Sequence, residues 1–408
     1  MSNLSDKHKN GYYLGVMSGT SADGIDLALV ELSKLAAAPR LVASFYRPYL
    51  EPMRSRISSL YQPGANEIDR AFHLDVALAH LFSEAIFDFL KQQKLTTNDI
   101  VAVGNHGQTL RHRPSGDNPF TLQIGCCQTL ATLTGIRVIG QFRRKDMALG
   151  GQGAPLVPIF HQQLFPERTQ DHVLVNIGGI ANLTLLPKQG SKQTVLGFDT
   201  GPGNALLDDW FTQCHPHSTE HFDCDGRWGS QGNIHHGLLS SFIADSFIAA
   251  AAPKSSGREY FNATWLQKHL NSLMLTLPQQ QQHLFTLNSE PDVQQSTIDA
   301  VDIQATLLAF TVQSIVDAIV AITPQAKIYV CGGGVHNQAL MTLLEQQLVI
   351  ANPDYSLKQL QTLMIDTDAL EAMAFAWLAF AFDCGLTSNI PAATGASREC
   401  TLGCEFLP

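Results

Sequence analysis

Several signatures of familiar protein classes are missing from this sequence. The first ten residues are polar or charged and lack the apolar core of a secretory signal, and the longest apolar stretch, Ala372–Phe382, is far shorter than a bilayer span. Basic residues are few, 26 against 36 acidic ones, and the net charge of -10 argues against binding to nucleic acid or to an anionic membrane. We therefore expect a cytoplasmic protein with small-molecule ligands, no nucleic-acid partner and no membrane partner.

Cysteine is too sparse to build the fold. Eight cysteines in 408 residues do not make a disulfide framework, and neither Cys126 and Cys127 nor Cys400 and Cys404 has the CxxC spacing of a zinc or redox site. One segment does gather metal-ligating residue types: Cys214, His215, His217, His221, Asp223 and Cys224. Because Pro216 interrupts this run and no helical pair of histidines can be drawn, a polar surface loop is favoured over a zinc site.

The two commonest nucleotide-binding sequences are also absent. The chain has neither the GxGxxG spacing of a dinucleotide-binding unit nor the GxxxxGK[ST] sequence of a P-loop. A dinucleotide-dependent oxidoreductase and a P-loop NTPase are therefore both disfavoured. What is present is ordinary for a globular protein, with 45% hydrophobic residues, 31 glycines and 19 prolines. The length favours two domains.

Two β-hairpins with polar tips are predicted, one in each half of the chain. The first joins strands over 12–17 and 25–32 through Ser18–Gly24, and the second joins strands over 173–177 and 180–186 through Gly178 and Gly179. A strand over 327–331, the turn Gly332–Gly334 and a helix over 336–348 follow later, as does a long helix over 302–322. Alternating strands and helices with a repeated hairpin predict an α/β protein of duplicated design.

The three glycine-containing turns are candidates for binding a polyphosphate. Glycine lets a ligand approach the backbone closely, and hydroxyls and amides can donate to phosphate oxygens. Two such hairpins closing on one polyphosphate are how actin-like and sugar-kinase folds hold ATP, whereas each turn alone is also compatible with an ordinary hairpin. The candidate ATP contacts are Gly19, Thr20, Ser21, Ala22, Asp23, Gly24, Ile25, Asp26, Asn176, Gly178, Gly179, Asn182, Gly332, Gly333, Gly334 and Asn337.

Longer strings identify a family. The sequence closely resembles anhydro-N-acetylmuramic acid kinase, of the sugar kinase/heat-shock/actin-like ATPase superfamily, in this order: GVMSGTSADGID (15–26), GNHGQTLRHRP (104–114), FRRKDMALGGQGAPLVPIFH (142–161), VNIGGIANLT (175–184), GFDTGPGNALLDDW (197–210), CGGGVHN (331–337) and NIPAATGASRECTLG (389–403). The resemblance implies two actin-like domains, which we place at 1–139 plus 385–408 and at 140–384, with an ATP cleft between them.

The resemblance also implies a reaction. The 1,6-anhydro ring of anhydro-N-acetylmuramic acid would be opened by water and oxygen 6 phosphorylated from ATP, giving N-acetylmuramic acid 6-phosphate for peptidoglycan recycling. The cofactors would be ATP and Mg²⁺, with Asp23 and Asp26 orienting the metal through its waters. The family suggests a homodimer. A kinase of another sugar or small acid and an actin-like or chaperone-like ATPase remain as alternatives.

Four further residues are candidates for binding the sugar. The resemblance places His106 and Gln108 near it, on what we expect to be a strand-to-loop turn, although a buried and hydrogen-bonded histidine is equally compatible with the pattern. Arg143 follows a strand end and is suited to the lactyl carboxylate, unless it belongs to a solvated basic run. Glu371 is either a sugar contact or an acid at the positive end of the helix over 369–382.

Asp199 is the candidate general base. We expect a strand over 194–198 that ends directly before it and a sharp turn over Thr200–Asn204, which would put the carboxylate at the edge of a sheet where α/β proteins bind ligands. The alternative is an aspartate that only braces the turn. Family resemblance places the catalytic aspartate in this GFDTGPGN string, which favours the base.

Overall fold

The chain folds into two compact units. The computed structural model describes residues 10–19, 21–34, 38–252, 254–258, 260–276, 298–360 and 369–408. The first unit comprises Met1–Arg168, Lys192–Leu196 and Leu363–Pro408, and the second comprises Thr169–Ser191 and Gly197–Thr362. These boundaries differ from those we expected at 139/140 and 384/385. Residues 140–168 belong to the first unit, and the helix expected over 369–382 packs on that unit's sheet.

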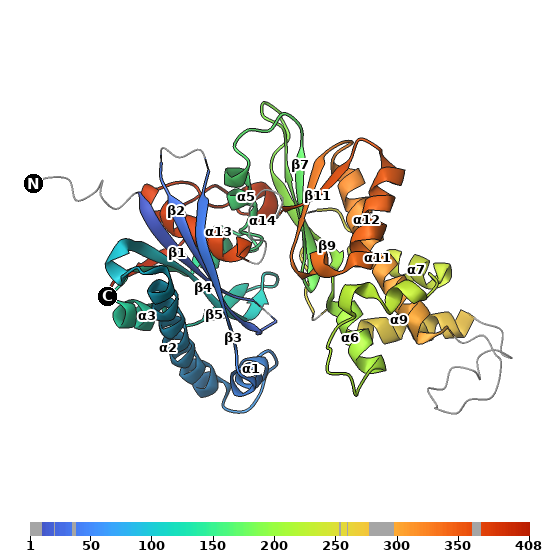
Figure 1. The fold of residues 1–408 in the computed structure, drawn as a ribbon, viewed down its shortest axis with the longest axis horizontal. Coiled ribbons are helices and arrows are strands. Elements are labelled where there is room, and N and C mark those ends of the chain that lie inside the picture. Colours follow the sequence, from blue (N-terminus) through green and yellow to red (C-terminus); the bar gives the residue numbers. More distant parts are fainter. Residues whose placement is uncertain are drawn as a thin grey trace, which may run out of the picture. The chain divides into compact units, whose positions relative to one another are not determined.

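A mixed sheet forms the centre of the first unit (Figure 1). Its strands run in the order β12-β6-β4-β1-β2-β3, with β5 paired to β4. The β1–β2 and β2–β3 pairs are antiparallel, whereas β1–β4 and β4–β6 are parallel. The elements are β1 (Gly11–Ser18), β2 (Gly24–Leu32), β3 (Arg40–Pro48), α1 (Glu51–Ser58), α2 (Glu67–Gln93), β4 (Ile100–Arg113), β5 (Phe120–Ile124), α3 (Cys127–Thr134), β6 (Val138–Gly140), α4 (Phe142–Ala148), α5 (Pro158–Leu164), α13 (Leu370–Cys384), α14 (Pro391–Thr394) and β12 (Cys404–Phe406).

The second unit is built around a five-stranded sheet in the order β11-β10-β7-β8-β9. The β7–β8 pair is antiparallel, and β7–β10 and β10–β11 are parallel. Its elements are β7 (His172–Ile177), β8 (Ile180–Leu186), β9 (Leu196–Pro202), α6 (Ala205–Cys214), α7 (His236–Ile243), α8 (Ser246–Ala249), α9 (Ala263–Thr276), α11 (Ala300–Ile322), β10 (Lys327–Cys331), α12 (Gln338–Ala351) and β11 (Ser356–Gln359).

The two sheets share one topology. Read from the third strand of each unit, the order β3-β2-β1-β4-β6 in the first corresponds to β9-β8-β7-β10-β11 in the second. In both, a hairpin is followed by a third neighbouring strand, and two parallel strands are added on the other side of the first strand. The prediction of an α/β protein of duplicated design is therefore confirmed, as are both predicted hairpins.

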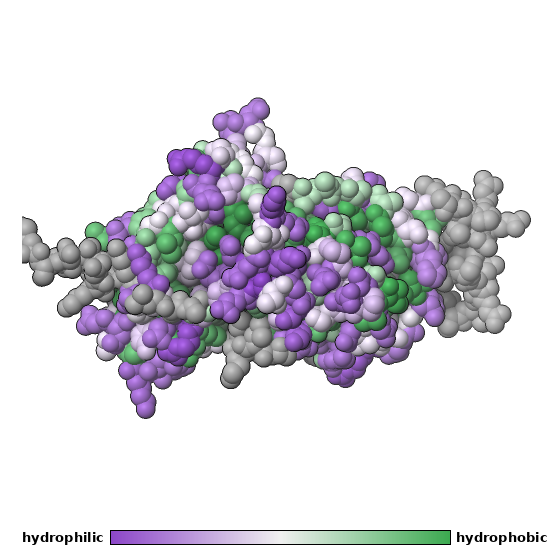
Figure 2. Space-filling model, turned by 90° about the horizontal axis from the view of Figure 1, so that it is seen from above, coloured by the Kyte–Doolittle hydropathy of each residue, from purple (hydrophilic) through white to green (hydrophobic). Residues whose placement is uncertain are grey.

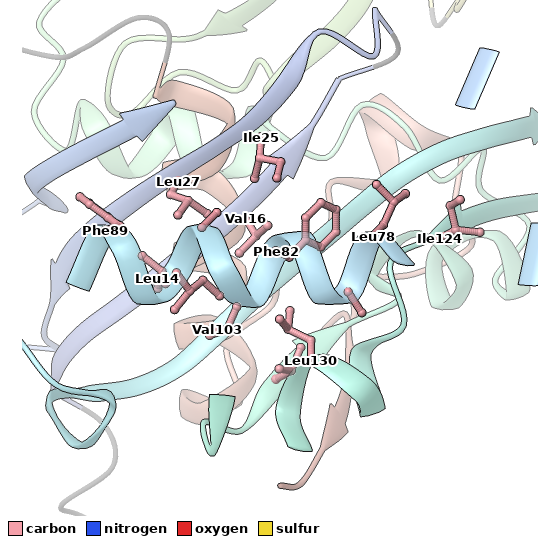
Figure 3. Packing of buried hydrophobic residues seen from close by; sticks show 14 of the residues in the cluster. Leu14, Val16, Ile25, Leu27, Leu78, Phe82, Phe89, Val103, Ile124 and Leu130 are labelled. Atoms are coloured by element: carbon pink, nitrogen blue, oxygen red, sulfur yellow. The ribbon is translucent and has the colours of Figure 1, made fainter. Parts of the chain in front are cut away.

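The core of the first unit lies between its sheet and the long helix α2. Leu14 and Val16 of β1 lie in one cluster with Leu78 and Phe82 of α2, between the strand and the helix, and all four are buried (Figure 3). Residues from β2, β4, β5 and α3 complete this layer. Apolar residues at alternate positions of β1 thus make one face of the sheet, and α2 covers it.

Helix α13 covers the opposite face at unusually short range. Gly15 lies between Leu14 and Val16 and so points away from α2, and a Cβ atom there would overlap the carbonyl oxygen of Ala372. A Cβ atom at Gly104 of β4 would overlap the carbonyl oxygen of Phe375. The helix backbone therefore rests on the sheet backbone, which only glycine permits.

One helix among the described residues is long and apolar enough to cross a membrane, α11 at Ala300–Ile322. In its most apolar window 67% of the residues are buried inside the protein, as in the core helix of a globular domain. The longest unbroken apolar run in the sequence is nevertheless Ala372–Phe382, because single polar residues such as Gln304 and Ser314 interrupt α11. Both of these polar residues are buried. Hydrophilic side chains cover much of the face shown in Figure 2.

Gly104→Ala should destabilise the first unit without touching a surface group. The added methyl group has to displace the α13 backbone, and overpacking of this kind costs about 1–3 kcal/mol. Urea titration followed by tryptophan fluorescence measures the loss. Gly19→Ala is the matched control, because its new Cβ would meet nothing nearer than the Ser21 hydroxyl at 3.5 Å. Equal stability of the two variants would contradict close docking of α13.

Candidate functional site

The first hairpin tip is fixed by hydrogen bonds from both sides. Within it the Ala22 amide donates to the Gly19 carbonyl over 3.1 Å, and the Ser21 hydroxyl donates to the Asp23 carboxylate over 2.9 Å. From outside, the Tyr49 amide donates to the Asp23 carbonyl over 2.8 Å. Asp23 is exposed and Asp26 is half-buried at the start of β2, and Thr20 lies outside the described residues.

Gln108 supports this tip. Its amide nitrogen donates to the Gly19 carbonyl over 3.0 Å, and its amide oxygen lies 2.6 Å from the Ser18 hydroxyl. The expected strand-to-loop turn is wrong: His106 and Gln108 lie inside β4, where Gly107 has a φ of +76° and the register with β1 shifts. Gln108 is fully buried, and its amide nitrogen also lies 3.3 Å from the Tyr61 hydroxyl and from the Thr109 carbonyl, so its side chain is occupied by contacts within the first unit.

The second tip is tied to the start of α6. The Asn204 amide donates to the Gly178 carbonyl over 2.8 Å, and the amides of Gly203 and Ala205 donate to the Gly179 carbonyl over 2.9 and 3.1 Å. The half-buried side chains of Asn176 and Asn182 belong to residues directly opposite each other across β7 and β8. The tip and the carboxyl end of β9 thus form one structure.

The third turn packs on the same strand. Gly332 has a φ of +81°, and a Cβ atom there would overlap the side-chain oxygen of Asn176; at Gly334 it would overlap the Ile177 side chain. Asn337 accepts from the Leu340 amide over 3.0 Å and so caps α12. The fold itself therefore requires Gly332, Gly334 and Asn337, and the expected strand over 327–331 is confirmed as β10.

At four other glycines in these turns, the packing of the chain does not require the absence of a side chain. A Cβ atom at Gly19, Gly178, Gly179 or Gly333 would come no closer than 3.5 Å to any residue other than its two neighbours in the chain, which is ordinary van der Waals contact, and none of the four has a φ in the left-handed region. Glycine at these positions leaves open space beside partly exposed turns. That space is what close approach of a ligand to the backbone would need.

A histidine and an arginine meet in the first unit. The Nε2 atom of His106 accepts from Nε and Nη2 of Arg143 over 3.1 and 3.0 Å, and Nη1 donates to the Gly153 carbonyl over 2.8 Å. The Nδ1 atom of His106 lies 2.7 Å from the Gly107 carbonyl, which assigns the proton to Nδ1. Burial, and then the Arg143 charge, hold the pKa of His106 well below its ordinary value, so this imidazole is a neutral acceptor.

Glu371 belongs to the same cluster. Burial raises its pKa, and the Arg143 charge opposes that rise. Burial likewise lowers the pKa of Arg143 to about 10, against the opposing charges of Glu371 and Asp146. Glu371 lies in the first turn of α13. It is therefore both an acid at the start of a helix and a neighbour of Arg143. The structure thus brings together three of the four predicted sugar contacts, His106, Arg143 and Glu371.

A buried carboxylate sets the position of Arg143. Asp146 is fully buried one turn later on α4 and accepts from the Gly153 amide over 2.8 Å, from Asn389 over 2.9 Å and from Thr394 over 2.8 Å. Gly153 therefore donates to Asp146 and accepts from Arg143. Three separate family strings, 142–161, 389–403 and 104–114, converge on this point.

His112 is a further candidate site residue, which the sequence patterns did not single out. It lies on β4 within the GNHGQTLRHRP string, its Nε2 atom is buried with no hydrogen-bond partner among the described residues, and its Nδ1 atom lies 3.0 Å from the Thr121 hydroxyl. Burial, and then the Arg143 charge, lower its pKa to about 4. A buried polar atom without a partner beside Arg143 points to a ligand group in that space. Membership of the same string as His106 was the available signal.

Asp199 lies in a different local structure from the one we expected. Strand β9 runs from Leu196 to Pro202, so the carboxylate is in mid-strand and the sharp turn comes only at Gly203 and Asn204. The reason is that β9 pairs at the edge of its sheet and the GPG segment continues the strand. One carboxylate oxygen accepts from the Ser256 amide over 2.7 Å and from the Ser255 hydroxyl over 3.1 Å.

The Cys- and His-containing segment has other contacts. His215 stacks on Phe211 and meets the edge of Trp228, and Asp223 accepts from the amides of Trp228 and Gly229. Across the part of the chain that the structure describes, no group of three or more His, Cys, Asp or Glu residues is arranged to hold a metal ion. Asp223 therefore organises a loop.

Comparison with known proteins decides the family. Residues 11–408 match the family model of anhydro-N-acetylmuramic acid kinase. A relative of that name from Colwellia psychrerythraea is 62% identical over 97% of this chain and 97% of its own, and one from Shewanella putrefaciens is 43% identical over 98% and 99%. The chain belongs to the anhydro-N-acetylmuramic acid kinase family. Among solved structures, component A of the (R)-2-hydroxyglutaryl-CoA dehydratase of Acidaminococcus fermentans has a TM-score of 0.41 at 10% identity, covering 92% of this chain and 99% of that chain.

Membership of the anhydro-N-acetylmuramic acid kinase family confirms the resemblance drawn from the sequence strings. It makes the chain a kinase, and the alternative of a chaperone-like or filament-forming ATPase is not favoured. The strings that carried the resemblance contain His106, Arg143 and the first hairpin tip in the first unit, and the second tip, the third turn and Asp199 in the second unit. Glu371 lies outside these strings.

The half-buried His112 imidazole, whose Nε2 atom is buried, should make stability depend on pH in a defined direction. It stays neutral in the folded chain down to a pKa of about 4, whereas in the unfolded chain it takes up a proton below about pH 6.5. Its contribution to stability is complete above pH 6.5 and is lost as the pH falls. Between pH 7.5 and 4.5 the wild type should lose about 2–3 kcal/mol more than His112→Asn. Urea titrations at both pH values measure this, and parallel losses would contradict it.

Proposed function

We propose that this chain opens the 1,6-anhydro ring of anhydro-N-acetylmuramic acid with water and transfers the terminal phosphoryl group of ATP to oxygen 6, giving N-acetylmuramic acid 6-phosphate. The observation that carries this proposal is family membership over residues 11–408. The site residues support it, because they supply a cation for a carboxylate, open glycine turns for a polyphosphate and a carboxylate for proton removal. We further propose that the enzyme works in the cytoplasm, in peptidoglycan recycling, as a homodimer.

The first unit provides the groups suited to the sugar. Arg143 uses three of the five N–H groups of its guanidinium for His106 and Gly153, which leaves two for the lactyl carboxylate. Glu371 can accept from a sugar hydroxyl, and the unpartnered Nε2 of His112 is a further polar contact. Because His106 is neutral, it directs the guanidinium without competing for the substrate's negative charge.

The glycine turns are suited to the nucleotide. Gly19, Gly178, Gly179 and Gly333 leave space beside the turn backbone that a side chain would fill, which fits close approach of phosphates. Magnesium prefers one or two carboxylates together with waters and phosphate oxygens. Asp23 and Asp26 fit that pattern, because both carboxylates act on one point, the Tyr46 hydroxyl. Burial is the main cause that raises the pKa of Tyr46, and the charges of Asp23 and Asp26 raise it further. A bound magnesium ion would neutralise phosphate charge there.

Asp199 is suited to act as the general base. Asp199 would take a proton from the water whose oxygen bonds to the anomeric carbon. The bond from that carbon to oxygen 6 breaks, and its electron pair goes to oxygen 6. Oxygen 6 then bonds to the terminal phosphorus as the bond from phosphorus to ADP breaks. The hydrogen bonds from Ser255 and Ser256 orient the carboxylate for the first step.

Asp199→Asn tests the proposed reaction. The amide keeps the shape but cannot take the proton, so turnover should fall by about 10²- to 10⁴-fold while ATP and sugar still bind. Mass spectrometry of the wild-type product should show the gain of one water and one phosphoryl group. A phosphorylated sugar with an intact anhydro ring would overturn the mechanism, and unchanged sugar with released phosphate would overturn the substrate. Turnover by the variant within about tenfold of wild type would overturn the role of Asp199.

Alanine at the open glycines tests the nucleotide turns. Gly178→Ala and Gly333→Ala should leave thermal unfolding nearly unchanged, because the chain has room for each methyl group. Their KM for ATP should rise by about tenfold, as expected when a methyl group separates a backbone donor from a charged acceptor, with KM for the sugar within about twofold. Gly64→Ala is the control, because its new Cβ would meet only the flexible end of the Arg70 side chain, at 3.3 Å. Equal rises for both substrates would argue against a nucleotide contact.

A further inference from the structure

A short segment of the second unit, Lys254–Arg258, runs beside β9 and carries two sets of contacts. Its first residues hold Asp199: the Asp199 amide donates to the Lys254 carbonyl over 3.0 Å, and Ser255 and Ser256 donate to the Asp199 carboxylate. Its last residue, Arg258, lies at the β7–β8 turn. The same five residues therefore contact both the candidate base and the glycine turn.

The Arg258 guanidinium lies over the open side of Gly179. Its Nε and Nη2 atoms would be 3.5 and 3.9 Å from a Cβ atom placed on that glycine. The side chain is 56% exposed and its Nη1 atom is 3.6 Å from the Asp209 carboxylate, an exposed ion pair of a kind that contributes at most about 1 kcal/mol. A guanidinium held this weakly, beside a turn with room for a ligand, is available to an incoming anion.

Lys254 does not compete for this role. Its ammonium donates to the carbonyls of Phe247 and Ile248 over 2.9 and 2.8 Å and lies 4.9 Å from the centre of the Phe247 ring. Lys254 is therefore committed to the backbone and to an aromatic face.

Acidic residues near the turn would otherwise repel a polyphosphate. Asp208, Asp209 and Asp223 interact electrostatically, and burial together with the other two acids raises the pKa of Asp208 to about 7 against the opposing charge of Arg258. A nucleotide at this turn needs a cation, and Arg258 is the cation that the segment places there.

We propose that Arg258 leaves Asp209 and binds the terminal phosphate of the nucleotide at the Gly178–Gly179 turn. This rests on the proposed kinase function. Its planar guanidinium donates two parallel hydrogen bonds to phosphate oxygens, which an ammonium cannot do. Because Ser255 and Ser256 hold Asp199, binding of the phosphate by Arg258 also fixes the segment that orients the base.

Arg258→Gln is the decisive variant, with Arg258→Lys and Asp209→Asn beside it. The first should raise KM for ATP by about tenfold or more and lower kcat, with KM for the sugar within about twofold, because it loses charge-assisted hydrogen bonds to phosphate. Arg258→Lys should recover part of this loss. Asp209→Asn frees the guanidinium and should leave KM for ATP unchanged or lower. If Arg258→Gln and Asp209→Asn instead weaken ATP binding equally, the arginine serves only its ion pair and the proposal fails.

Calorimetry without sugar separates this proposal from the proposed function. Arg258→Gln should weaken binding of ATP and leave the affinity for AMP within about twofold, because AMP lacks the terminal phosphate. Equal losses for ATP and AMP, or no loss for ATP, would overturn the role of Arg258. A wild type that binds ATP but does not convert the anhydro sugar would overturn the proposed function. The comparison of ATP and AMP binding would then still test the role of Arg258.

Discussion

The contact between α13 and the sheet of the first unit fixes the rest of that unit's chemistry. Because Gly15 and Gly104 have no side chains, the α13 backbone lies directly on β1 and β4. This places Glu371 beside Arg143 and the Phe375 ring 4.6 Å from the His106 ring. A helix held farther from the sheet by side chains would separate the acid from the arginine. The arrangement of the candidate sugar contacts thus depends on a backbone-to-backbone distance set by two glycines.

The sequence predicts those parts of the fold that local patterns control. Both hairpins, the long helix α11 and the strand β10 follow from alternating or periodic apolar residues ended by glycine or polar turns. It predicts the location of Asp199 and His106 less well, because each lies in a strand that continues through glycines normally read as turns. In both cases pairing with a neighbouring strand outweighs the local preference of glycine.

The site shows a similar division between local and long-range information. Two family strings lead to His106 and Arg143, and the family resemblance adds Glu371, which lies outside the strings. The structure brings the three together from β4, α4 and α13. The strings could not show that Gln108 faces the first tip, since its partners Ser18 and Gly19 are distant in sequence. Arg258 lies outside every quoted string, and only its position over Gly179 singles it out.

The Asp146 network has a consequence for synthesis of the chain. Its partners Asn389 and Thr394, together with α13 and β12, belong to the last part of the sequence, whereas the second unit is complete by Thr362. A ribosome therefore releases all of the second unit before the residues that finish the first. Until those residues emerge, the face of the first sheet that α13 covers in the native structure stays exposed. The order of emergence makes the interrupted unit the last to reach its native packing and the one most exposed to aggregation during translation.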